Sequence, residues 1–96
     1  MKSSTARVPT ESSAKYVSQV CKHFSHRLEV RLGDGEGEIA FPEARALLAS
    51  EPDVLVITVE AGDAETVERI QGVVERHLDR FAFREVPLQY GWSVIA

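Results

Sequence analysis

Apolar residues in the first third of the chain change their spacing once, which predicts a helix followed by a strand. One apolar set recurs at helical spacing and has polar residues on its other side. Thr10 stands where a helix N-cap is expected, so we predict a helix over residues 11–26. After it, Leu28, Val30 and Leu32 alternate with charged residues, as in a half-buried strand. The helical set is Tyr16, Val17, Val20 and Phe24.

The middle of the chain predicts antiparallel strands. A glycine-rich turn over residues 33–37 precedes a return strand that carries Ile39 and Phe41. Residues 43–50 fit a helix by propensity and a strand by context, because a hairpin turn at 51–53 follows them. We favour the strand. Residues 54–59 are apolar on both faces, which predicts a central place in the sheet.

The last third predicts a second helix and a closing strand. Asp63 is placed as an N-cap, and an apolar stripe runs from Val67 to Phe81, so we predict a helix over about 63–81. Apolar and polar residues then alternate over 88–94, which predicts a strand. Tyr90 and Trp92 on that strand are interpreted as core residues, with an exposed patch for a partner as the alternative.

Together these patterns predict one α+β domain over residues 1–96. The expected fold is a two-layer sandwich, in which a mostly antiparallel sheet of four to six strands carries both helices on one face. Hydrophobic residues make up 44% of the chain, enough for a core without disulfides.

Charge and composition exclude several classes of protein. The net charge is -4 and no block of Lys or Arg occurs, so no nucleic acid is expected as a partner. No apolar run approaches the ~20 residues of a membrane-spanning helix. The single cysteine and the polar first residues agree with a cytoplasmic protein. No cofactor is indicated.

The only cysteine and the three histidines fall near the predicted helix ends. Cys21, His23, His26 and His77 are therefore the candidates for a metal site. Spacing and topology oppose one, because four strands between the helices would place their carboxyl ends at opposite ends of the sheet. On that argument His77 could not join the other two. We favour structural roles for these residues, and no metal is expected.

Two other groups invite a chemical interpretation. Cys21 as a nucleophile has no evident base beside it, so an enzyme is the less favoured hypothesis. Arg80 and Arg84, with Glu85 and two phenylalanines, could hold an anionic ligand. The alternative is a helix end whose phenylalanines fill the core, and we favour it.

Two segments also resemble the signatures of a known family. These are Cys21 to Arg27 (CKHFSHR) and His77 to Glu85 (HLDRFAFRE), and the likeness begins near Ser4. They resemble a small bacterial family catalogued as domain of unknown function 2218. Similar domains also occur fused to siderophore-interacting proteins, so the resemblance implies an accessory role in iron or siderophore handling. It supplies no catalytic residues.

Three functional hypotheses follow. The first is a binding or accessory module whose polar site is His23, His26 and Arg27, with Arg80 and Arg84 as further ligand-binding candidates. Its partner would be a small anionic ligand or a siderophore-handling protein. The second is a structural module that forms a homodimer through the open sheet face. The third is an enzyme that uses Cys21 or the histidines.

Overall fold

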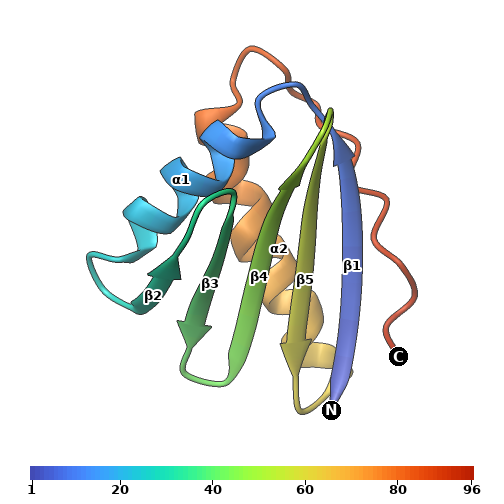
Figure 1. Ribbon diagram of the computed structural model, residues 1–96. Coiled ribbons are helices and arrows are strands. Elements are labelled where there is room, and N and C mark those ends of the chain that lie inside the picture. The colour runs from blue at the N-terminus through green and yellow to red at the C-terminus, as the bar shows by residue number, and fades with distance from the viewer.

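The computed structural model describes residues 1–96 as a five-stranded antiparallel sheet with two helices on one face (Figure 1). The strand order is β1-β5-β4-β3-β2. This confirms the predicted α+β sandwich, and the two helices begin and end within two residues of the predicted limits. The elements are β1 (Lys2–Pro9), α1 (Ser13–Phe24), β2 (Glu29–Leu32), β3 (Glu36–Phe41), β4 (Ala44–Glu51), β5 (Val54–Ala61) and α2 (Ala64–Phe81).

The core lies between the sheet and the helices. β5 has hydrogen-bonded neighbours on both sides, β1 and β4, which agrees with the predicted central place of residues 54–59. Its inner residues Leu55, Ile57 and Val59 are fully buried under the helices. Val54 and Val56 point to the opposite, uncovered face and are only half-buried. The sheet therefore has a covered face and an open face, and the open one is not purely polar.

The ambiguous segment at 43–50 is a strand, as favoured. β4 pairs with β5 along its full length, from Ala44 opposite Ala61 to Glu51 opposite Val54, and pairs with β3 on its other edge. A tight turn through Pro52 and Asp53 joins β4 directly to β5, so these two strands form a hairpin. Asp53 adopts the left-handed conformation in this turn (φ 59°). Pairing on both edges thus overrides the helical propensity of the segment.

The two helices begin in different ways. Asp63 caps α2 as predicted, since Thr66 N–H donates to its side chain at 2.7 Å. The prediction that Thr10 caps α1 is wrong. The N-cap position is Ser12, and its side chain makes no capping bond. Thr10 Oγ1 instead accepts from Ser12 N–H (3.1 Å) and donates to Glu85 (2.8 Å), so it forms a turn before the helix and holds a segment beyond α2.

The predicted closing strand over 88–94 is also wrong, although the segment does follow the edge of β1. Ser93 N–H donates to Thr5 O at 2.9 Å, and Ser3 and Ala96 exchange two backbone bonds. These bonds are too few for a regular ladder, because Tyr90 and Trp92 turn toward α2 and bond its carboxylates. Neither helix of the fold is long and apolar enough to cross a membrane.

Candidate functional site

Two histidines that are far apart in the sequence meet where α1 crosses α2. The ring centres of His23 and His77 are 4.9 Å apart, and Phe24 and Phe81 pack against them. His23 is exposed and His77 is half-buried, so the pair lies at the surface. The expectation that His77 could not reach the histidines of the first helix is therefore wrong for His23.

The error lies in where the helices cross. Four strands do separate them, as predicted. However, α1 has only 12 residues against 18 in α2, and it packs across the last part of α2. Tyr16 in the first half of α1 donates a hydrogen bond to Glu85, which lies beyond α2. The end of α1 consequently reaches back to His77, one turn before the end of α2.

The surroundings of this histidine pair are cationic. Burial, followed by His77, Arg80 and His26, lowers the pKa of His23 below its ordinary value, so its neutral form is favoured. His77 Nδ1 lies 2.7 Å from the backbone oxygen of Val73. A carbonyl oxygen can only accept, so Nδ1 carries a hydrogen, and in the neutral imidazole the lone pair is then on Nε2.

The other predicted ligand-binding residues do not converge on one place. His26 and Arg27 are exposed in the turn after α1. Arg84 lines a separate hollow of about 410 Å³ with Lys15, Tyr16 and Glu85. The Glu85 carboxylate there accepts from Tyr16 and Thr10. Burial, followed by Glu85, raises the pKa of Tyr16. No group of three or more His, Cys, Asp or Glu residues is placed to hold a metal ion.

Cys21 lies on the buried face of α1 and not at the surface. Its exposed fraction is 0%, and its sulfur packs against Gly37 of β3. Burial raises the pKa of the thiol to about 11, so the reactive thiolate is scarce at neutral pH. The arrangement gives Cys21 a packing role.

We therefore expect the Cys21 thiol of the native protein to resist alkylation by iodoacetamide at pH 7.5, at less than about a hundredth of the rate in denaturant. The thiol must become exposed by unfolding before it can react. Mass spectrometry of samples quenched over time, with and without 6–8 M urea, measures both rates (about the range that unfolds small domains). Equal rates would contradict the buried placement of Cys21.

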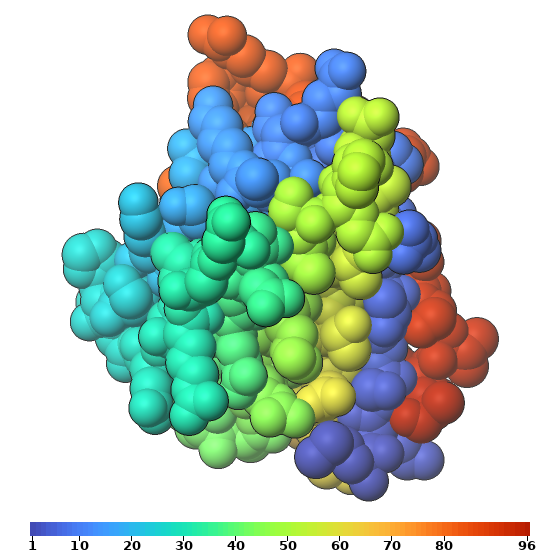
Figure 2. Space-filling model, viewed as in Figure 1, coloured from blue at the N-terminus to red at the C-terminus, as the bar shows by residue number.

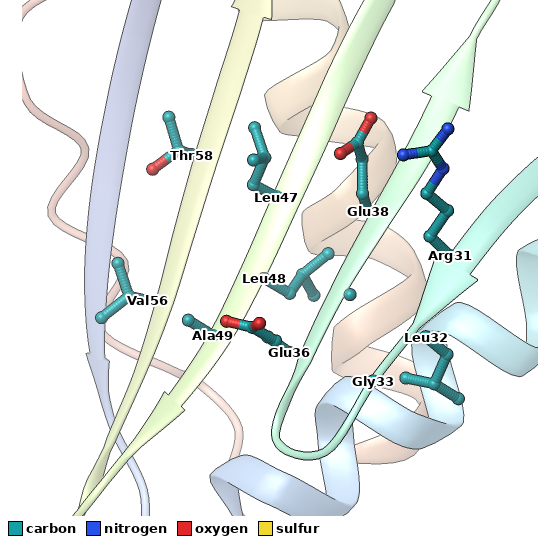
Figure 3. A pocket seen from close by; sticks show the side chains of 11 residues that line it. Arg31, Leu32, Gly33, Glu36, Glu38, Leu47, Leu48, Ala49, Val56 and Thr58 are labelled. Carbon is teal, nitrogen blue, oxygen red and sulfur yellow. The ribbon is translucent and has the colours of Figure 1, made fainter.

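A further hollow is on the open sheet face, and none of the predicted site residues lines it. It measures about 490 Å³, and Leu47 of β4 and Val56 of β5 form its apolar floor, with Thr58 beside them (Figure 3). Arg31 and Glu38 rise beside it from β2 and β3. Figure 2 looks onto this face, where the side chains of β2 to β5, green to yellow, stand together. We call this hollow the sheet groove.

Charge around the sheet groove is unevenly compensated. Arg45 binds Glu60 at 2.7 Å and approaches Glu38 at 3.6 Å, and Arg7 binds Glu51 at 2.8 Å. Arg31 forms none of the four ion pairs of the structure. An apolar floor beside an uncommitted guanidinium suits a ligand with an apolar body and an anionic group. The sequence indicates an apolar open face, because Val54 and Val56 lie on the side of β5 that points away from the core.

Comparisons with known proteins agree with the fold and supply no activity. The family described as an uncharacterized protein conserved in bacteria (DUF2218) matches residues 5–93. The NMR structure of PA4090 from Pseudomonas aeruginosa is similar, with a TM-score of 0.83 and 35% sequence identity over 97% of this chain and 96% of that one. No curated protein matches.

Proposed function

The chain belongs to the bacterial family DUF2218, and on that premise we propose that it is a non-enzymatic binding module for a small amphipathic anion. The observation that supports this is the sheet groove, with its apolar floor and the unpaired Arg31. Its volume of about 490 Å³ falls within the range of roughly 300–1,000 Å³ that small-molecule sites occupy.

Different residues of the groove would contact different parts of the ligand. Leu47 and Val56 are half-buried, and covering them with an apolar ligand removes their remaining surface from water. Arg31 is exposed and can donate two parallel hydrogen bonds to a carboxylate. Glu36 and Glu38 stand on the same rim and disfavour a second negative group. The preferred ligand is therefore apolar with one anionic end.

Octanoate, the sulfonate dye anilinonaphthalene sulfonate and a set of ferric siderophores are suitable probes. Amide shifts in ¹⁵N–¹H spectra locate the binding surface and give the affinity. For octanoate we expect the shifts to cluster on β3, β4 and β5, at residues that line the groove. Arg31→Gln is expected to weaken octanoate binding about tenfold or more, since a charge-assisted hydrogen bond contributes roughly 1.5–3 kcal/mol.

Arg7→Gln is the matched control. Arg7 is another exposed arginine on the sheet, and its partner Glu51 lies outside the groove lining. Its replacement is expected to leave octanoate binding within twofold of the wild type. Shifts that map to the helix side, or equal effects of the two substitutions, would refute the groove as the site. So would the absence of binding by every probe at millimolar concentration.

A homodimer through the same face is the second candidate. The face has an apolar centre, Leu47 and Val56, within a rim of charged residues, which is the usual anatomy of an interface. A stable dimer buries about 800 Å² on each partner. Sedimentation at micromolar concentration tests it. We expect Leu47→Lys to dissociate a dimer, and a wild type that is monomeric throughout would reject this candidate.

A role in iron or siderophore handling would be a narrower form of the binding function. It rests on the resemblance alone, and the ferric siderophores in the probe set test it directly. The polar site predicted from His23, His26 and Arg27, with Arg80 and Arg84 as further candidates, stays a proposal, as does a cytoplasmic location. The inference below concerns one part of that polar site.

A further inference from the structure

We propose that His23 and His77 form a two-imidazole site for a divalent transition-metal ion at the crossing of α1 and α2. Imidazole nitrogen is a preferred ligand of Zn²⁺, Ni²⁺ and Cu²⁺. This site lies on the helix side of the sheet and the sheet groove lies on the open face, so either proposal can fail without the other.

The separation of the rings fits a shared ion. Metal–nitrogen distances are about 2.0–2.1 Å, and with a tetrahedral or square arrangement two imidazoles on one ion have ring centres roughly 5 Å apart. The ring centres of His23 and His77 are 4.9 Å apart and their planes are tilted by 44°. The rings are thus spaced as ligation requires before any ion arrives.

The second-sphere contact of His77 also suits metal binding. Its Nδ1 donates to Val73 O, one helical turn earlier, which fixes the ring and leaves Nε2 as the ligating atom. Metal-bound histidines commonly donate their other nitrogen to a carbonyl in this way. The His23 ring also makes T-shaped contacts with Phe24 and Phe81, with ring centres 5.4 and 5.9 Å away.

The rest of the coordination sphere would be water. No third His, Cys, Asp or Glu completes a protein cluster, and the nearby Arg80 charge opposes a cation. Affinity is therefore expected to be modest, and to increase from Co²⁺ through Ni²⁺ to Cu²⁺.

Untagged protein titrated with Ni²⁺ and Zn²⁺ tests the proposal. An ion that joins two helices binds the folded state best, so the wild-type Tm is expected to rise by about 5–10 °C near saturation. His23→Gln and His77→Gln should each abolish most of that rise and weaken binding at least tenfold. His26→Gln is the matched control, three residues from His23 and exposed, and should bind within twofold of the wild type.

Imidazole ¹⁵N shifts of the wild type give a readout that needs no variant to fold. With Zn²⁺ we expect the resonances of His23 and His77 to move and those of His26 to stay. No Tm change at millimolar metal would overturn the proposal. So would wild-type binding by His77→Gln, or Zn²⁺ shifts that include His26 and exclude His77.

Discussion

Replacement of Gly37 by alanine is expected to lower the free energy of unfolding by about 2–3 kcal/mol, as overpacking of a well-filled core does. Gly37 is buried on the inner face of β3. A methyl group there would collide with the sulfur of Cys21 and meet Leu32 at 3.5 Å. The sulfur cannot retreat easily, because Cys21 is fully buried on a helix packed against the sheet.

The collision can be isolated by a double-mutant cycle. Cys21→Ala alone is expected to cost about 1 kcal/mol through a small cavity. In the double variant the Gly37→Ala methyl occupies the space of the sulfur, so the combined loss should be smaller than the sum by about 1 kcal/mol or more. Urea unfolding followed by circular dichroism measures all four proteins. Strict additivity would show that the two positions are not in contact.

This contact also marks a limit of what the sequence reveals. Alternation over 28–32 and at Ile39 and Phe41 correctly predicted a β-hairpin. Composition assigned Gly37 to the turn, whereas only residues 33–35 lie between β2 and β3. The reason for a glycine at 37 is the Cys21 sulfur, which comes from a different element, and no local pattern carries that information.

The position at which the helices cross could not be predicted from the sequence either, for a similar reason. Counting strands correctly established that four of them separate the helices. The position at which α1 crosses α2 depends on helix lengths and on contacts such as Tyr16 with Glu85, which are long-range. The strand count was therefore right, but the conclusion that His77 lies far from His23 was wrong. The sequence did contain a sign of the sheet groove, since Val54 and Val56 are apolar although they lie on the face opposite the core.

The C-terminal segment provides the second large expected effect. Trp92→Ala is expected to cost about 2–3 kcal/mol, somewhat below the value for a fully buried tryptophan. The indole stacks on Tyr90, with ring centres 6.3 Å apart and planes within 3°, and its Nε1 donates to Glu75 of α2. Tyr90 in turn donates to Asp79 at 2.7 Å, and burial and Asp79 raise its pKa. Losing the indole loosens the joint between α2 and the edge of β1.

Val94→Ala is the matched control from the same segment. Val94 is 88% exposed, so its truncation should change stability by less than about 0.5 kcal/mol. Trp92→Phe retains an aromatic ring and removes the bond to Glu75, and a loss of about 1 kcal/mol is expected. Urea denaturation followed by circular dichroism suits all three variants, because Trp92 is the only tryptophan and both Trp92 variants lack tryptophan fluorescence. Equal losses for Trp92→Ala and Val94→Ala would mean that the segment does not pack on α2 through Trp92. A loss confined to Trp92 would show that the packing and hydrogen bond of this side chain on α2 stabilise the segment, and that the exposed Val94 adds little.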